Sequence, residues 1–169
     1  TLKSLPSNDK KIVVVNSNSP QNEDAIIREY LKKYPNIKYI MTDEQETLYA
    51  AWNRGIKASS GKYITNANTD DRHAPEMLET FAQMLEANPD QAGVYSHFYR
   101  TEIPHQTWQN KTPSSIAKWH PPYSFQQLLR ANFMGPQPMW RRSLHDEYGY
   151  FDVSMKVCGD WEFFLRCGQ

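Results

Sequence analysis

Short apolar runs alternate with amphipathic segments through the first hundred residues, and this alternation is the strongest constraint on the fold. The first run, residues 12–15, consists of four β-branched residues and is typical of a strand buried on both faces of a sheet. By the same criteria we predict strands at 12–15, 37–41, 63–67 and 92–98, and helices at 22–34, 48–58 and 75–88. This spacing predicts an α/β fold, in which helices cover both faces of a mostly parallel sheet.

The alternation is lost after residue 100. Residues 101–122 contain four prolines and two tryptophans, and we expect them to form a long loop. A short helix at 125–131, a strand-like piece at 139–140 and a short helix at 160–166 are predicted to follow. The chain of 169 residues has the length of one domain, so residues 1–169 are treated as a single domain.

Charge and composition narrow the classes of partner. Nineteen basic and nineteen acidic side chains give a net charge of zero, whereas nucleic-acid-binding domains usually carry a basic excess, so no nucleic-acid partner is expected. No run of about 18 apolar residues is present, and no basic and then apolar leader opens the sequence, so neither a transmembrane segment nor a signal peptide is predicted. Two cysteines are too few for a disulfide scaffold and fit a reducing cytoplasm. Aromatic residues make up 13% of the chain, which favours a protein that binds flat or sugar-like ligands.

Polar residues follow two of the predicted strands, at 16–19 and at 68–71. Ligands bind α/β sheets beyond the carboxyl ends of the strands, so both segments are expected at the same rim. Asp70 and Asp71 are adjacent carboxylates, which are costly to desolvate unless they are paired. Since Mg²⁺ prefers one or two carboxylates together with phosphate oxygens, Asp70 is a candidate metal ligand, and Asn68 could help or bind a ribose hydroxyl. The alternative interpretation is a solvated turn before the next helix.

A third acidic position lies at the start of the last predicted helix. Asp160 stands where an N-cap belongs and Glu162 falls in the first turn, where carboxylates interact favourably with the helix dipole. The simplest interpretation is therefore a well-capped amphipathic helix. The functional interpretation is that Asp160 stays ionised, points toward a ligand and acts as a general base, while Glu162 binds acceptor hydroxyls.

Several common enzyme signatures are absent from the sequence. The first predicted strand is not followed by the G-x-G-x-x-G dinucleotide fingerprint, and the chain contains neither a P-loop nor a G-x-S-x-G nucleophile elbow. The five histidines lack tight metal-ligand spacing among themselves and with Cys158 and Cys167, so a zinc site is not expected.

Four motifs, in a fixed order, resemble the family-2 glycosyltransferases of the GT-A fold. Residues 46–56 are similar to the family's A-x-N-x-G-I helix, and residues 58–64 are similar to the segment that leads from it into a strand. Asn68-Thr69-Asp70-Asp71 resembles the D-x-D-D motif at the end of that strand. Residues 149–152 and 159–166 resemble the family's G-x-F-D and E-D-x-x-x-x-x-R segments, so the likeness runs from about residue 11 to residue 166.

The resemblance implies a Rossmann-like GT-A domain that transfers a sugar from a nucleoside diphosphate donor to an acceptor hydroxyl with inversion. Residues 11–100 would form the nucleotide-sugar-binding half and residues 101–169 the acceptor-side half. Asp70 would match the metal-binding aspartate, with Mn²⁺ or Mg²⁺ as cofactor, and Asp160 would match the catalytic base. The implied donor-binding residues are Asn16, Ser17, Asp43, Glu44, Asn53, Asn68 and Asp71. The candidates for acceptor contacts are Trp140, Trp161 and Glu162.

The sequence departs from the family pattern in several places. Asn68 replaces the usual first aspartate, and Asn16-Ser17 replaces the acidic pair that contacts the nucleoside, where Asp43 or Glu44 could serve instead. The family's first strand and helix and its last helices have no counterpart, so we expect the chain to be part of a longer protein.

The implied partners are a nucleotide sugar and a saccharide or lipid-linked acceptor, used in polysaccharide or glycoconjugate synthesis. The parent protein is expected in the cytoplasm, with peripheral association with the inner face of the membrane left open. Two other functions also stay open: a nucleotidyltransferase, and a non-catalytic carbohydrate-binding or assembly domain derived from the same fold.

Overall fold

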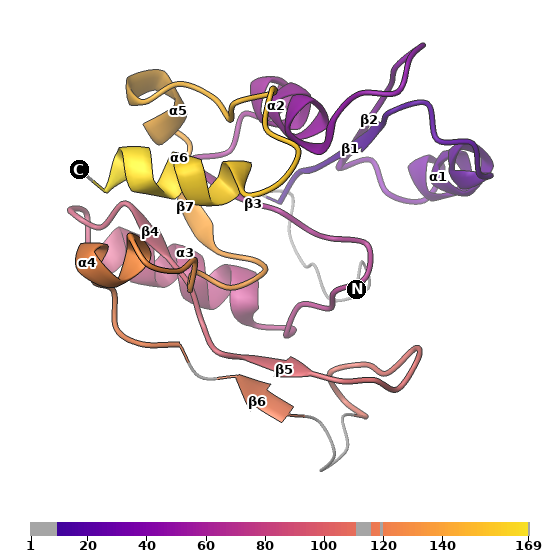
Figure 1. Ribbon diagram of the computed structural model, residues 1–169. Helices are drawn as coiled ribbons and strands as arrows, with labels where there is room; N and C mark the ends of the chain where they lie inside the picture. The colour runs from indigo at the N-terminus through magenta and orange to yellow at the C-terminus, as the bar shows by residue number, and fades with distance from the viewer. Residues whose placement is uncertain (1–9, 111–115, 119, 169) are drawn as a thin grey trace.

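The computed structural model describes residues 10–110, 116–118 and 120–168, and these form an α/β arrangement of short strands and helices (Figure 1). The strands are β1 (Ile12–Asn16), β2 (Ile37–Met41), β3 (Tyr63–Thr65), β4 (Gly93–Val94), β5 (Phe98–Arg100), β6 (Ile116–Lys118) and β7 (Met139–Arg141). The helices are α1 (Glu23–Leu31), α2 (Leu48–Ala58), α3 (Met77–Ala87), α4 (Phe125–Leu128), α5 (Leu144–Glu147) and α6 (Gly159–Cys167).

The strands pair in three small groups within the described residues. β1 and β2 are parallel, with Ile12 opposite Ile37 and Asn16 opposite Met41. β7 lies between β3 and β4 and is antiparallel to both, so β3 and β4 run in the same direction. β5 and β6 form an antiparallel pair. The predicted α/β class is confirmed, but the sheet is more mixed than predicted, because a strand from late in the chain inserts beside β3.

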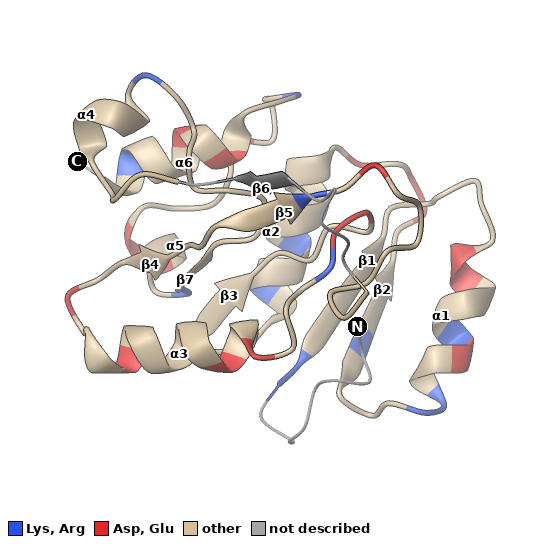
Figure 2. Cartoon of the chain, turned by 90° about the horizontal axis from the view of Figure 1, so that it is seen from below, with Lys and Arg blue, Asp and Glu red and all other residues tan. Residues whose placement is uncertain are grey.

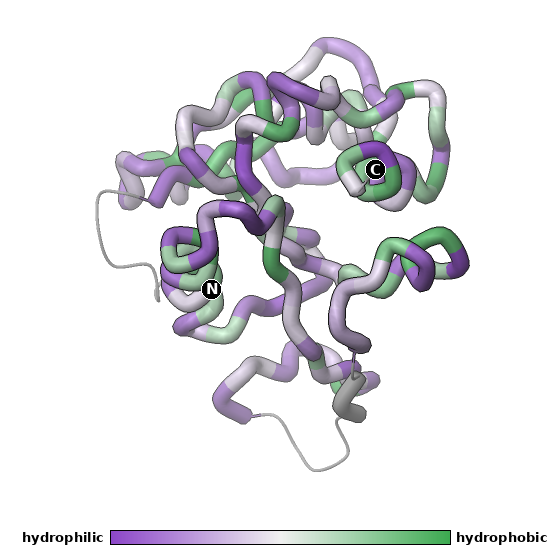
Figure 3. Tube along the Cα trace, turned by 90° about the vertical axis from the view of Figure 1, so that its left-hand side faces the viewer, coloured by the Kyte–Doolittle hydropathy of each residue, from purple (hydrophilic) through white to green (hydrophobic). Residues whose placement is uncertain are grey.

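The helices cover the strands from opposite sides, with α2 above them and α3 below them in Figure 1. Helix α2 begins after Thr47, whose hydroxyl accepts a hydrogen bond from the Ala50 amide, as an N-cap residue should. Its buried residues Tyr49, Asn53 and Ile56 are spaced four and three apart and therefore share one face. The tube in Figure 3 alternates between apolar and polar residues along the helices, which is the same amphipathic pattern.

The core consists of two apolar clusters. The larger one joins α2, β7 and α6 and contains the aromatic residues Tyr49, Trp140, Phe151, Phe163 and Phe164. The smaller one joins α3 to β4 and β7 through Phe81, Leu85, Val94 and Met139. The sequence segment that forms α6 is therefore packed against the first half of the chain rather than forming a separate unit.

Most predicted elements are present, with differences in their lengths. The strand predicted at 92–98 shortens to Gly93–Val94, and the loop predicted at 101–122 contains β6, which pairs with β5. Acidic and basic residues are interspersed along α1 (Figure 2), in keeping with the zero net charge. None of the helices in the described ranges is long and apolar enough to cross a membrane. Trp119, one of the two tryptophans of the segment 101–122, lies outside the described residues.

Candidate active site

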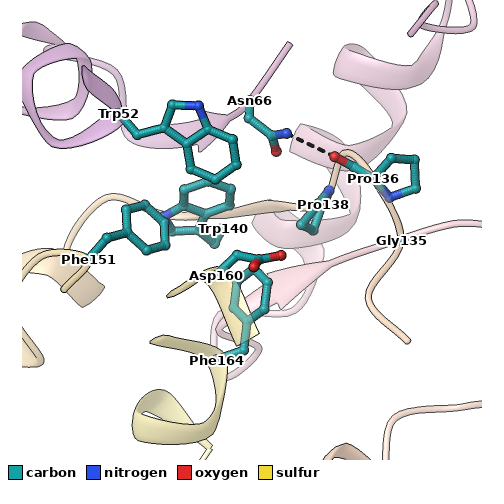
Figure 4. A pocket seen from close by; sticks show the side chains of 9 residues that line it. All are labelled: Trp52, Asn66, Gly135, Pro136, Pro138, Trp140, Phe151, Asp160 and Phe164. Atoms are coloured by element: carbon teal, nitrogen blue, oxygen red, sulfur yellow. Dashed lines mark hydrogen bonds between the residues drawn. The ribbon is translucent and has the colours of Figure 1, made fainter. Parts of the chain in front are cut away.

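Asp160, in the first turn of α6, lines a small pocket where the two halves of the chain meet (Figure 4). Helix α2 contributes Trp52, the end of β3 contributes Asn66, and the segment before β7 contributes Pro136 and Pro138. Phe164, one turn after Asp160 on α6, closes the pocket. A half-buried carboxylate thus lies among aromatic and amide side chains, just beyond the end of β3.

Two hydrogen-bond donors hold the Asp160 carboxylate. The Tyr49 hydroxyl donates to Oδ1 at 3.1 Å, and the Asn132 side-chain amide donates to Oδ2 at 3.0 Å. Tyr49 comes from α2, 111 positions earlier in the chain, and Asn132 comes from the loop after α4. An ionised carboxylate can accept about four hydrogen bonds, so Asp160 keeps the capacity to accept a proton from a ligand.

A chain of side-chain amides links this pocket to the acidic segment after β3. The Asn66 amide donates to the Pro136 carbonyl at 2.8 Å (dashed in Figure 4) and to Asn68 Oδ1 at 3.1 Å. The Asn68 amide in turn donates to Asp71 Oδ2 at 2.8 Å. Asn68 and Asp71 are therefore connected to the pocket that Asp160 lines.

Asp70 is exposed, whereas Asn68 and Asp71 are half-buried. Within the described ranges, no hydrogen bond or ion pair engages its carboxylate, and no group of three or more His, Cys, Asp or Glu side chains could hold a metal ion. A cation bound by Asp70 would thus need most of its ligands from a bound molecule. Mg²⁺ and similar hard cations are often bound in this way, with phosphate oxygens completing the shell.

The predicted donor-binding residues of the first two strands lie at the carboxyl ends of β1 and β2. Asn16 is buried; its Oδ1 accepts from the Ser19 amide at 2.9 Å and its Nδ2 donates to the Tyr39 hydroxyl at 3.1 Å. Ser17 Oγ accepts from the Glu46 amide at 2.6 Å.

Asp43 and Glu44 are exposed in the turn after β2, and Asn18 ties this turn to the end of β1 by donating to the Asp43 carbonyl at 2.9 Å. The side chains of Asn16 and Ser17 thus shape this rim, while the carboxylates of Asp43 and Glu44 face solvent.

Asn53, a predicted donor contact, is bonded within the fold through its side-chain amide. It is 6% exposed, its Nδ2 donates to the Phe151 carbonyl at 2.8 Å, and its Oδ1 accepts from the Phe151 amide at 3.0 Å. Both ends of the side-chain amide are therefore used to join α2 to the segment that leads into α6. The sequence could not reveal this, because the partner lies 98 positions away.

Trp140 is a core residue that borders the pocket. It is 3% exposed, and its indole N–H donates to Nε2 of buried His145 at 2.9 Å. His145 Nδ1 lies 3.1 Å from the Gly149 carbonyl, an arrangement that assigns the proton to Nδ1. Burial lowers the pKa of His145, in keeping with a neutral ring. Only the part of the Trp140 ring that lines the pocket is therefore left to contact an acceptor, as the sequence predicted.

Trp161 and Glu162 lie apart from Asp160. They line a separate apolar hollow on α6 together with Leu129 and Met155. The Trp161 indole donates to the Leu128 carbonyl at 2.7 Å, and Glu162 forms a two-point ion pair with Arg166. Trp161 and Glu162 thus face a different hollow from the pocket that Asp160 and Phe164 line, and their acceptor role stays a prediction.

The sequence interpretation missed four residues around Asp160: Tyr49, Trp52, Asn66 and Asn132. Tyr49 and Trp52 lie in α2, within residues 46–56, where an aromatic side chain carries no local sign of a site. Asn66 directly follows β3, and its position at a strand end was a usable signal. Asn132 carries no local signal, because only the folded chain brings it to Asp160.

Comparison with known proteins agrees with this architecture. Residues 1–151 match the family model described as "Glycosyl transferase family 2". The uncharacterized glycosyltransferase YwdF of Bacillus subtilis is 27% identical over 143 residues, which are 80% of this chain and 50% of YwdF. The chain spans about half the length, or less, of the curated relatives it matches first.

Two solved structures share the fold. S. aureus TarS 1-349 in complex with UDP-GlcNAc has a TM-score of 0.67 at 17% identity, covering 98% of this chain and 47% of that one. The mannosyltransferase PcManGT from Pyrobaculum calidifontis, in complex with GDP-Man and Mn²⁺, has a TM-score of 0.59 at 18% identity, covering 86% and 39%. The predicted GT-A fold is thus confirmed. Since the family model covers most of its length, the chain belongs to glycosyl transferase family 2.

Proposed function

We propose that this domain transfers a sugar from a nucleoside diphosphate donor to an acceptor hydroxyl, with inversion at the anomeric carbon and Asp160 as the general base. The observation that carries this proposal is the Asp160 pocket. A carboxylate held by two donors lies opposite the amide chain that leads to Asp71. The fold neighbours solved with UDP-GlcNAc and with GDP-Man support a nucleotide sugar as the donor.

The chemistry assigned to Asp160 is proton transfer. A free lone pair of the carboxylate accepts the proton of the acceptor hydroxyl as the hydroxyl oxygen attacks the anomeric carbon. The bond from the anomeric carbon to the diphosphate oxygen breaks on the opposite face, and the nucleoside diphosphate departs with the electron pair. A positioned base of this kind contributes about 10²- to 10⁴-fold in rate.

The acidic segment after β3 fits a divalent cation that is shared with the donor. Asp70, exposed and without an intramolecular partner among the described residues, and the second oxygen of Asp71 would hold it. When bound, Mn²⁺ or Mg²⁺ would neutralise charge on the departing diphosphate. Asn68 is a less suitable ligand, because its Oδ1 already accepts from Asn66. Its amide instead orients Asp71.

The setting of the reaction belongs to the proposal as well. We place the parent protein in polysaccharide or glycoconjugate synthesis, with a saccharide or lipid-linked acceptor, on the cytoplasmic side of the membrane. Cys158 and Cys167 are both free thiols, which agrees with a reducing compartment.

The test uses the full-length protein with UDP-GlcNAc and GDP-mannose as donors. Turnover is measured as release of the nucleoside diphosphate, and binding of UDP and GDP is measured by calorimetry with and without Mn²⁺.

Asp160→Asn is expected to keep nucleotide binding and to lower turnover by about a hundredfold or more. Asp70→Ala is expected to remove the part of nucleotide binding that depends on Mn²⁺. Asp90→Asn, at an exposed position in the turn before β4, is the matched control. Unchanged turnover in Asp160→Asn would show that Asp160 is not the base.

A further inference from the structure

The Tyr49 hydroxyl lies at the N-terminus of α6, where it contacts Asp160. Tyr49 is 3% exposed and donates to Asp160 Oδ1 at 3.1 Å. Burial raises the pKa of Tyr49, and hydrogen bonds from the backbone N–H groups of Asp160 and Gly159 act in the opposite direction. The residue that precedes the helix, Cys158, forms no side-chain cap of its own.

Gly159 makes this contact possible. A Cβ atom at position 159 would lie 2.7–2.8 Å from three atoms of the Tyr49 ring, closer than real side-chain contacts allow. The ring of Tyr49 occupies the space that a side chain at 159 would need.

Asn132 holds the other oxygen of the carboxylate. Its Nδ2 donates to Asp160 Oδ2 at 3.0 Å, and its Oδ1 accepts from the Met134 amide at 3.1 Å. The bond from Met134 fixes which end of the Asn132 amide faces Asp160, since of its two ends only the oxygen can accept from a backbone N–H. Each oxygen of Asp160 thus receives one donor, and the two donors come from different segments of the chain.

We propose that Tyr49 and Asn132 are positioning residues, which hold the Asp160 carboxylate in the orientation that meets the acceptor hydroxyl. This inference rests on the proposed function, in which Asp160 is the base. Two hydrogen bonds from separate segments fix the rotation of the carboxylate about its last bond, and each oxygen keeps a lone pair for the acceptor. A base fixed in this way spends more time in productive geometry than one that rotates freely.

The test is a double-mutant cycle in the full-length protein, with UDP-GlcNAc and GDP-mannose as donors and release of nucleoside diphosphate as the readout. Tyr49→Phe keeps the ring and removes the hydroxyl. We expect it to lower kcat about tenfold while the calorimetric affinity for UDP or GDP stays unchanged. Asn132→Asp keeps the acceptor for Met134 but replaces the donor with a like charge, and a loss of at least the same size is expected.

The cycle separates positioning from a general structural role. In the Asp160→Asn background, Tyr49→Phe is expected to cause no further loss, because the group through which it acts has gone. Tyr95→Phe is the matched control, since this partly buried tyrosine donates to the Pro121 carbonyl at 2.6 Å, away from Asp160. It is expected to leave kcat unchanged.

The outcomes also separate this inference from the proposed function. If Asp160→Asn abolishes turnover but Tyr49→Phe and Asn132→Asp do not change it, the positioning role is wrong and the base assignment stands. If Tyr49→Phe lowers the residual rate of Asp160→Asn by the same factor as in the wild type, Tyr49 acts on the structure alone and the inference is overturned. If Asp160→Asn keeps full turnover, the proposed function itself fails.

Discussion

Asp160 packs against an aromatic core, whereas Asp70 lies in an exposed polar loop. The side-chain amides of Asn66 and Asn68 connect this loop to the pocket that Asp160 lines. Behind Asp160, the rings of Tyr49, Phe151 and Phe163 are among the most buried side chains in the described residues. In the segment 66–71, by contrast, every residue is exposed or only half-buried, and side-chain amides make the connections.

The difference agrees with what the two sides are proposed to do. A base must be placed to within a fraction of an ångström, and rigid packing supplies that placement. A loop that shares a cation with a diphosphate receives its remaining contacts from the ligand, so it needs little packing of its own. Changes near Asp160 should therefore alter stability, whereas changes in segment 66–71 should alter ligand binding.

The largest loss of stability is expected for Phe163→Ala. Phe163 is 0% exposed, and its ring centroid lies 4.6 Å from that of His145 and 4.9 Å from that of Phe151. Truncation of a buried phenylalanine leaves a cavity and costs about 3–5 kcal/mol, measured by denaturant unfolding of the full-length protein. Leu129→Ala, at a position 52% exposed, is the control and should cost less than about 1 kcal/mol. Similar losses of stability in the two variants would refute the contrast between the aromatic core behind Asp160 and the loop that contains Asp70.

Asn53→Ala is expected to cost somewhat less, about 2–3 kcal/mol, because it leaves the buried amide and carbonyl of Phe151 without partners. The measurement is again denaturant unfolding, combined with calorimetry of UDP and GDP binding. Asn88→Ala is the control, since the Asn88 side chain also donates to a carbonyl but is exposed. Weaker nucleotide binding with unchanged stability would restore the donor contact that the sequence predicted.

The comparison also explains how much of the fold could be predicted from the sequence. The predicted bounds 37–41 and 48–58 coincide with β2 and α2, because apolar periodicity and turn residues are local signals. The insertion of β7 between β3 and β4 could not be predicted, because it pairs residues about 45 to 80 positions apart in an antiparallel sense that no local pattern specifies.

The candidate site divides along the same line. Asp160 at a helix start and the acids at a strand end could be recognised from local signals, and the structure links both to one pocket. The partners of Asp160 could not be recognised, because Tyr49 and Asn132 reach it only through tertiary packing. The acceptor role of Trp161 stays a prediction: its aromatic ring suggested stacking, and the structure adds that its indole N–H is bonded within the fold.

Acidification is expected to destabilise the protein through His145, which lies in the aromatic core behind Asp160. The loss should be smaller than that caused by Phe163→Ala or Asn53→Ala. Burial lowers the pKa of His145 in the folded state, so below about pH 6.5 the unfolded chain takes up a proton more readily than the folded one. Stability is therefore full above this pH and falls as the pH drops toward the lowered folded pKa. Unfolding followed from pH 7.5 to 5 checks this, and His145→Phe should flatten the slope. His105→Gln, at an exposed position, is the control and should leave the slope unchanged. An unchanged slope in His145→Phe would assign the acid sensitivity to other groups.

The smallest effect on stability is expected in segment 66–71, for Asn68→Asp. Asn68 is half-buried, and its amide donates to Asp71 Oδ2 at 2.8 Å, so a carboxylate there replaces a hydrogen bond with a repulsion at the edge of the solvent. Without metal we expect a loss of at most about 1 kcal/mol. With Mn²⁺ and UDP or GDP, the variant should instead be more stable than the wild type, because a second carboxylate can join Asp70 at the cation. Thermal unfolding with and without Mn²⁺ and nucleotide measures both states, and Asn88→Asp controls for the added charge. If Mn²⁺ and nucleotide stabilise Asn68→Asp no more than the wild type, the cation does not lie beside residue 68. The segment 66–71 would then lack the ligand-dependent role that we assign to it.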